Sequence, residues 1–260
     1  MRVISVNVNG IRAAFKKGFY QWLSRQRADF VCLQETKAQL DQLSAEIASP
    51  SHWYTHFEDA EKKGYSGVAL FSRTEPEKVV YGMGIERFDR EGRFVQADFG
   101  NLSIVSVYFP SGSSGETRQK VKYEFMESFE SWLESKSGDG REYIVCGDWN
   151  IAHKKKDIKN WRSNQKNSGF LPEERAWMDR ILGSGTWIDV FRLMNESENQ
   201  YTWWSNRGRA WENNVGWRLD YQIATTKLAK LATKERIFKS KRFSDHAPVI
   251  IDYAVDSNFF

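Results

Sequence analysis

The sequence is poor in cysteine, with only Cys32 and Cys146 among 260 residues. Two cysteines cannot supply a disulfide framework, and each lies inside an apolar run (FVCLQ and YIVCGD) that is typical of a buried strand. Neither has a cysteine or histidine neighbour at zinc-finger spacing, and the four histidines form no HExxH pattern. We therefore expect reduced core thiols and no structural zinc.

Long apolar runs are also missing, and no stretch approaches the twenty residues that a membrane-spanning helix needs. Asn7 and Asn9 interrupt the first apolar stretch before it could serve as a signal-peptide core. There is no linker-like segment, low-complexity tract or repeat that would mark a second domain. We expect a single domain over residues 1–260, monomeric and without membrane contact. The expected location is the cytoplasm, at the nucleoid if the source is a bacterium.

Charge of one sign does not dominate either, because the formal net charge is only +4. Hydrophobic residues make up 40% of the chain and eleven residues are tryptophan, which excludes a disordered protein. Basic residues gather in two runs: six between Lys154 and Lys166 against Asp157 alone, and seven between Lys227 and Arg242 against one acid. Such runs are either solvated faces or phosphate-binding surfaces, and charge alone leaves both readings open.

Several short apolar or alternating runs predict strands, at 2–8, 29–34, 66–72, 93–99, 102–109, 142–147, 219–224 and 248–254. Helical periodicity predicts helices over 116–135, about 172–183 and about 19–27. Strands and helices do not alternate regularly. The pattern therefore favours packed sheets covered by a few helices over a doubly wound parallel sheet.

Polar residues interrupt or end the predicted strands at eight points, which are Asn7, Glu35, Tyr108, Asp148, Asn150, Asp220, Asp245 and His246. Polar groups at strand ends are not buried without partners, so each needs a loop hydrogen bond or a functional site. Taken singly, an aspartate or asparagine here is an ordinary turn residue, and a histidine is an ordinary satisfied polar residue. Taken together, these residues form a candidate site if the strand ends meet at one rim.

The residue types in this set suit a particular chemistry. Magnesium prefers hard oxygen ligands and commonly binds one or two carboxylates, with water and substrate phosphate completing its coordination. The chain lacks the GxxxxGK[ST] loop of nucleotide-hydrolysing enzymes. The set therefore favours a magnesium-dependent phosphodiesterase over an NTPase.

Ten blocks of the chain resemble the exonuclease III type of apurinic/apyrimidinic (AP) endonuclease, within the endonuclease/exonuclease/phosphatase superfamily. They are NVNGIRA (7–13), LQETK (33–37), KGYSGVA (63–69), DREGRFV (89–95), YFPSG (108–112), GDWNIAH (147–153), NSGFLPEER (167–175), YTWWSNR (201–207), NVGWRLDY (214–221) and SDHAPV (244–249). They follow the family's order along nearly the whole chain. The resemblance implies an α/β four-layer sandwich, in which two mainly antiparallel sheets pack face to face with helices outside.

The resemblance also implies metal ligands, at Asn7, Glu35, Asp148, Asn150, Asp245 and His246. Glu35, helped by Asn7, is the expected main carboxylate for Mg²⁺, with Mn²⁺ as a substitute. The other residues are available to a second or moving ion. Asn9 stands where some relatives have a second aspartate near the metal, which leaves Glu35 more alone at the ion.

Catalytic roles are implied for Tyr108, Asp148, Asn150, Asp220, Asp245 and His246. Asp220 and His246 resemble the family's Asp-His pair, in which the carboxylate fixes the imidazole. His246 acts either as the base or as a phosphate-bound cation, and Asp148 competes with it for the role of activating water. Tyr108 and Asn150 are expected to contact the phosphate and stabilise charge in the transition state.

Substrate contacts are implied for Trp217, Leu219, Asn214, Arg207, Ser111 and Asn167. Trp217 and Leu219 resemble the walls of a pocket that accepts a flipped-out abasic sugar and is too small for a base. For Trp217 alone, plain core packing is the simpler reading. Arg207 stands where the family places a loop that enters the DNA groove. Ser111, Asn167 and the Lys154–Lys166 run are expected to contact the DNA backbone.

The expected function is repair of double-stranded DNA that carries abasic sites or blocked 3′ ends. The resemblance implies incision 5′ to the abasic site, with 3′-phosphodiesterase and 3′-to-5′ exonuclease activity. One alternative within the fold is a 3′-end-processing exonuclease with little AP incision. A lipid or inositol phosphatase shares the polar core but lacks the NVGWRLDY and NSGF blocks. A catalytically silent DNA-binding module would satisfy the basic runs alone.

Overall fold

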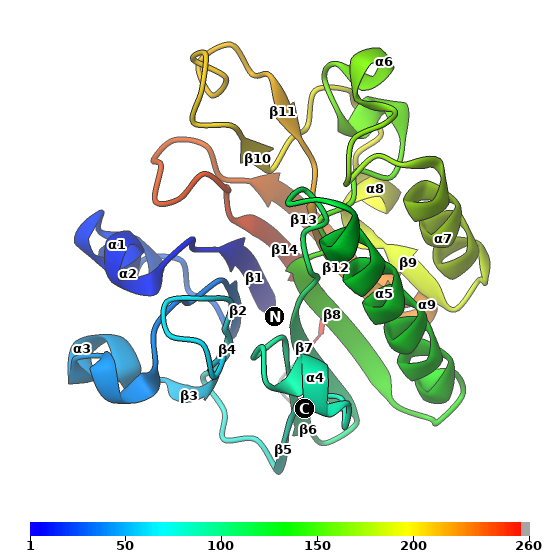
Figure 1. Cartoon of the computed structure of the whole chain (residues 1–260). Coiled ribbons are helices and arrows are strands. Elements are labelled where there is room, and N and C mark those ends of the chain that lie inside the picture. Colours follow the sequence, from blue (N-terminus) through cyan, green and yellow to red (C-terminus); the bar gives the residue numbers. More distant parts are fainter. Residues whose placement is uncertain (256–260) are drawn as a thin grey trace.

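A computed structural model describes residues 1–255 of the chain, and its strands form two large sheets (Figure 1). The first sheet has the strand order β13 (Ala232–Ile237), β14 (Val249–Tyr253), β1 (Arg2–Asn7), β2 (Phe30–Gln34), β4 (Val68–Ser72), β3 (Tyr54–Glu58). The second has the order β5 (Lys78–Tyr81), β6 (Phe94–Phe99), β7 (Leu102–Tyr108), β8 (Glu142–Asp148), β12 (Asp220–Thr225), β9 (Trp187–Asp189). Within each sheet one pair is parallel, β1 with β2 and β7 with β8, and the other pairs are antiparallel.

The inner faces of the sheets pack against each other. Cys32 and Leu70 from the first sheet and Ile104, Cys146 and Ala224 from the second belong to one apolar cluster and are fully buried. Both cysteines are free thiols, as expected from their apolar surroundings. Alternate residues of each strand point away from this cluster, so each sheet has a second apolar face that a helix layer must cover.

Helices cover these outer faces. On the second sheet, α5 (Glu116–Lys136) and α7 (Pro172–Gly183) place Phe125, Phe129 and Trp177 against Val145 and Ile223 (Figure 1). On the first sheet the covering helices are α1 (Ile11–Lys16), α2 (Phe19–Leu23) and α3 (Ala45–Ala48). The expected four-layer α/β sandwich with mainly antiparallel sheets is confirmed.

The remaining elements are short and lie in the connections. They are η1 (Leu40–Gln42), α4 (Glu86–Asp89), η2 (Lys155–Asp157), α6 (Trp161–Asn164), α8 (Val190–Met194), β10 (Trp203–Trp204), β11 (Gly216–Trp217) and α9 (Thr226–Ala229). Strands β10 and β11 form a two-stranded ribbon beyond the end of the main sheets (Figure 1). Over residues 1–255, every helix is too short or too polar to cross a bilayer.

All eight predicted strands are present, with ends that differ by at most two residues. Four edge strands and the ribbon were missed. Edge strands β5 and β13 carry exposed or half-buried residues at most positions and therefore lack an apolar run. Of the predicted helices, only the one over 19–27 is shorter than expected. Helix α2 ends at Leu23, and the chain then turns through Arg27, whose φ of +50° ends the helical path.

Candidate active site

The eight polar residues at strand ends converge because of the strand directions. Parallel strands β1 and β2 end together, with Asn7 opposite Gln34 and Glu35 next in the chain. Parallel strands β7 and β8 also end together, with Tyr108 opposite Asp148. Antiparallel strand β12 begins at that same level, with Asp220 opposite Asp148. The ends of both sheets therefore meet at one rim.

Contacts between side chains join the two sheets at this rim. The Asn7 amide Nδ2 donates to Glu35 Oε1 at 2.7 Å and to Asp148 Oδ2 at 2.8 Å. Its Oδ1 accepts the backbone N–H of Asn9 at 2.9 Å. Asn7 is fully buried, and in this orientation it holds the two carboxylates in place. Its role as a metal ligand stays a prediction.

The turn after β8 is positioned by a tryptophan. Trp149 is fully buried in the helix layer, where its ring stacks on Phe109 with the centroids 5.0 Å apart. Asn150 then adopts a left-handed backbone conformation with φ +53°, and its backbone N–H donates to Asp148 Oδ1 at 2.9 Å. Asp148 and Asn150 line the cleft at the rim, on either side of this buried anchor.

His246 lies in the loop before β14 and is 4% exposed. Its Nδ1 is 2.8 Å from Asp220 Oδ2, and its Nε2 is 3.8 Å from Asp148 Oδ2. Burial disfavours the imidazolium, but the charges of Asp220 and Asp148 outweigh burial and raise the pKa of His246 to about 10. The histidine is therefore a cation near neutral pH in the metal-free protein, with Asp220 holding its Nδ1–H.

The two central carboxylates differ in pKa. Burial raises the pKa of Asp148 to about 7, because the nearby Asp220 and Glu35 add to burial while His246 only partly offsets it. Burial also disfavours ionised Glu35, but the Lys37 ammonium at 2.5 Å and the Asn7 amide outweigh burial and lower its pKa. Glu35 is thus a permanent anion, whereas Asp148 can exchange a proton near neutral pH.

A test of the His246 environment is the pH dependence of unfolding without metal. Because its folded-state pKa of about 10 lies above the 6.5 of a free histidine, His246 contributes stability that is fully present below pH 6.5. That contribution is lost as the pH rises toward 10. We expect guanidinium unfolding in EDTA to show this loss in the wild type, and His246→Asn to lack it. Parallel pH curves for the two proteins would contradict this environment for His246.

Three side chains could hold a metal ion. Glu35, Asp148 and His246 each offer a ligand atom, and these atoms all lie within 4.8 Å of one another. Two carboxylates fit a hard divalent cation, so the donors present suit the implied metal. Asp245 is held slightly apart, by Asn9 Nδ2 at 2.8 Å and Trp203 Nε1 at 3.1 Å. Asp245 lines the same cleft.

The cleft over the rim has a volume of about 560 Å³. It is lined by Glu35, Tyr108, Asp148, Asn150, Asp245 and His246, together with the predicted substrate residues Ser111, Asn167, Trp217 and Leu219. Burial, together with the charges of Glu35 and Asp148, keeps the pKa of Tyr108 well above its usual value. One cleft thus combines five of the six candidate catalytic residues with an apolar wall, while Asp220 does not line the cleft and contacts His246.

Two predicted substrate residues lie outside the cleft lining. Arg207 is exposed on the loop between β10 and β11, and Asn214 holds that loop by accepting from Trp204 Nε1 at 3.1 Å and donating to the Asn199 carbonyl at 3.2 Å. Trp203 was missed, although it lines the cleft and packs edge-on against Trp217 with a centroid distance of 6.1 Å. The YTWWSNR block offered no local signal that separates Trp203 from the adjacent, buried Trp204.

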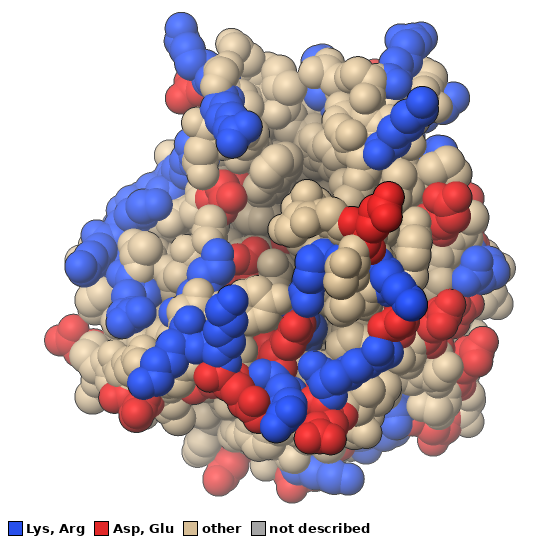
Figure 2. Space-filling model, in the orientation of Figure 1, with Lys and Arg blue, Asp and Glu red and all other residues tan. Residues whose placement is uncertain are grey.

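Basic residues flank the cleft. Figure 2 shows two projections, over the β10–β11 loop and over the α6 segment, that carry Lys and Arg at their tips with a hollow between them. In the Lys154–Lys166 run, Lys154 pairs with Asp179 and Lys156 with Glu196, while Lys166 lines the cleft. Part of the run is therefore paired within the protein, and part faces the site.

Comparisons with known proteins give consistent matches. The model described as the Endonuclease/Exonuclease/phosphatase family matches residues 4–246. An exodeoxyribonuclease of Bacillus subtilis is 38% identical over 96% of this chain and 98% of its own length. The DNA repair nuclease APEX1 of Danio rerio is 38% identical over 98% of this chain and 83% of its own length.

Solved structures agree with these matches. An AP endonuclease from Archaeoglobus fulgidus superposes with a TM-score of 0.90 at 26% identity. That superposition covers 98% of this chain and 100% of the archaeal chain. The similarity therefore extends over both sheets and both helix layers.

Proposed function

Because the chain belongs to the Endonuclease/Exonuclease/phosphatase family, we propose that it hydrolyses the DNA backbone 5′ to abasic sites. The residues proposed to do so are Glu35, Asp148 and His246 at the rim, which we call the rim cluster. The protein is a hydrolase of the DNA repair nuclease type. The observation that carries the proposal is the cleft in which Glu35, Asp148 and His246 lie beside an apolar wall made by Trp217 and Leu219. We further propose that residues 1–260 act as one monomeric domain in the cytoplasm, at the nucleoid in a bacterium.

A divalent metal ion, which we propose is Mg²⁺, would be held by Glu35 with Asp148 beside it. His246, which is protonated in the metal-free protein, would be a ligand only after losing its Nε2 proton. When bound, the ion supplies positive charge that polarises the phosphate. Lys37 contacts both Glu35 and Asn9 Oδ1, at 2.5 Å and 2.6 Å, and so neutralises part of the site without metal. Mn²⁺ is proposed as a substitute.

The charges around each side chain support an assignment for the proton transfer. In the metal-free protein Asp220 and Asp148 keep His246 protonated near neutral pH, which favours Asp148 as the acceptor of the water proton. We assign to His246 the role of a cation that binds a phosphate oxygen through Nε2, with Nδ1 held by Asp220. Asp148, with a pKa of about 7, accepts the proton of the attacking water. Tyr108 and Asn150 line the same cleft and donate to the phosphate in the transition state.

The apolar wall supports an abasic site as the substrate. Trp203, Trp217 and Leu219 line one side of the cleft, and Trp217 packs closely against Gly169, where a Cβ would come within 3.1 Å of the indole. A sugar without a base is readily unstacked and fits a narrow apolar pocket. Basic residues on both projections would bind the duplex backbone on either side (Figure 2).

The experiment that tests this function uses a duplex with one tetrahydrofuran abasic analogue. We expect strand cleavage in Mg²⁺, cleavage in Mn²⁺, and none in EDTA. Offering a recessed 3′ end and a 3′-phosphoglycolate end in parallel separates AP incision from 3′-end processing. An uncut abasic duplex in every tube would overturn the proposal, and phosphate release from a phosphoinositide would favour the lipid phosphatase alternative.

A further inference from the structure

Four charged side chains are buried behind the apolar wall of the cleft. Asp157, Asp189, Arg192 and Arg218 are 0%, 7%, 8% and 1% exposed. Two carboxylates face two guanidinium groups, so the formal charges of the cluster balance. Of these residues, none lines the cleft or contacts the candidate metal ligands. The proposed mechanism gives this cluster no role.

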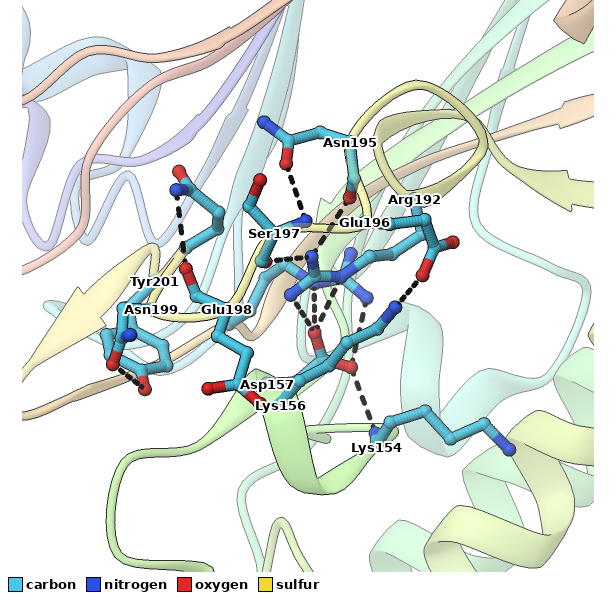
Figure 3. A network of polar contacts seen from close by, with 12 residues as sticks. Lys154, Lys156, Asp157, Arg192, Asn195, Glu196, Ser197, Glu198, Asn199 and Tyr201 are labelled. Carbon is cyan, nitrogen blue, oxygen red and sulfur yellow. Dashed lines mark hydrogen bonds and ion pairs between the residues drawn. The ribbon is translucent and has the colours of Figure 1, made fainter.

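Asp157 is the centre of the cluster (Figure 3). Its Oδ1 accepts from Arg192 Nη2 at 2.7 Å and from Arg218 Nε at 2.8 Å, and its Oδ2 accepts the backbone N–H of Lys154 at 2.9 Å. Burial opposes its ionisation, but the two arginines outweigh burial and keep its pKa far below the usual range. The carboxylate therefore stays charged and connects separate parts of the chain.

The backbone around Asp157 is hydrogen-bonded to the β10–β11 ribbon. The Arg218 N–H donates to the Asp157 carbonyl at 2.7 Å, and the Lys159 N–H donates to the Gly216 carbonyl at 3.0 Å. Between these bonds, Ile158 forms an antiparallel bridge with Trp217. One β-bridge and two backbone hydrogen bonds thus join residues 157–159 to the segment that carries the pocket wall.

Arg218 joins this cluster to the pocket. It stands between Trp217 and Leu219 in an extended segment, so its side chain points to the opposite face from theirs. Trp217 and Leu219 line the cleft, whereas Arg218 points back to Asp157 and to Asp189, which accepts from its Nη2 at 2.7 Å. Each guanidinium contact behind the wall therefore restricts the position of the two side chains in front of it.

Arg192 restrains the segment that leads to the other tryptophan of the wall, Trp203. Its Nη1 donates to the carbonyls of Asn195 and Ser197, at 3.0 Å and 2.7 Å (Figure 3). The segment from Asn195 to Tyr201 leads directly into β10, which carries Trp203. Both strands of the ribbon that forms the pocket wall are thus anchored to the Asp157 cluster.

We propose that Asp157 is a positioning residue that sets the width of the pocket, and with it the preference for an abasic sugar over an intact nucleotide. This inference rests on the proposed function. Charge-assisted hydrogen bonds fix the wall at defined donor and acceptor positions, whereas apolar contacts are non-directional. Loosening it would misplace the abasic sugar and would at the same time admit a base.

The test compares Asp157→Asn with the wild type on two substrates, the tetrahydrofuran duplex and a matched duplex with a normal recessed 3′ end. We expect the ratio of kcat/KM for the abasic duplex to that for the normal 3′ end to fall by about ten-fold or more. Arg192→Lys keeps the charge but loses the planar fork, and should lower the ratio less. It also serves as the test if Asp157→Asn does not fold.

The control is Leu133→Ala, which removes a buried side chain from the helix layer of the second sheet. It lowers stability without touching the pocket wall, so both activities should keep their ratio when assayed below every unfolding midpoint. An unchanged ratio in Asp157→Asn and Arg192→Lys would show that the cluster acts on stability alone and would overturn the inference. A wild type that leaves the abasic duplex whole would instead overturn the proposed function.

Discussion

Replacing His246 with asparagine should slow abasic incision by about 10² to 10⁴, the range in which a positioned proton-transfer or charge-stabilising group usually acts. Asparagine keeps a polar side chain beside Asp220 but removes the cation whose Nε2 lies 3.8 Å from Asp148. Losing that cation also removes the charge that partly offsets the effect of burial on the pKa of Asp148. We expect the single-turnover rate constant for incision to fall, with little change in the affinity for abasic duplex.

His153→Asn is the matched control for this prediction. His153 is also buried and also contacts a carboxylate, with Nε2 2.7 Å from Asp179 Oδ1, but it does not line the cleft. Incision by this variant should stay within a few-fold of the wild type. If both variants lose activity equally, or if His246→Asn keeps full activity, His246 is not a catalytic residue.

Replacing Glu35 with glutamine should raise the Mg²⁺ concentration needed for half-maximal incision by about 100-fold or more. Glutamine preserves the size of the side chain and can still contact Asn7. It removes the negative charge of Glu35, which has a lowered pKa, whereas the pKa of the other candidate carboxylate, Asp148, is raised. High Mg²⁺ should restore part of the rate, because the Asp148 carboxylate remains. The measurement is a Mg²⁺ titration of the single-turnover rate.

Glu142→Gln provides the comparison for Glu35. Glu142 is a buried carboxylate at the opposite end of β8 from Asp148, where it contacts Thr225. Its replacement should leave the Mg²⁺ titration unchanged. A Glu35→Gln variant that titrates like the wild type would place the ion elsewhere.

Much of this fold could be predicted because its central strands are buried on both faces. The eight strands found from sequence are continuous apolar runs or clear alternations, whereas missed strands such as β13 lie at sheet edges and carry lysine and arginine. The rim could be foreseen for the same reason. A polar residue such as Asp148 is conspicuous at the end of a run like YIVCG.

The pairing and charge states at the rim could not be foreseen. Asn7 and Asp148 are 141 positions apart, and their contact depends on how the two sheets pack. The pKa separation between Glu35 and Asp148 depends on Lys37 reaching one carboxylate and not the other. That geometry favours Asp148 over His246 as the base, a choice that residue types alone left open.

Some functional features gave no local signal in the sequence. Asp157 looked like a lone acid in a basic run, yet it is the centre of the buried cluster behind the pocket wall. Trp203 and Trp204 are adjacent aromatic residues, and only the strand geometry shows that Trp203 alone lines the cleft. Long-range packing decides both cases.

In the proposed reaction, the rim cluster directs water at the phosphorus on the 5′ side of an abasic site. The decisive measurement is incision of a duplex with a natural abasic site in ¹⁸O-labelled water, followed by mass spectrometry of both fragments. We predict a 3′-hydroxyl on the upstream fragment and one ¹⁸O atom in the 5′-phosphate of the downstream fragment. An unsaturated sugar at the 3′ end, or a 5′-phosphate without the label, would contradict hydrolysis at this site.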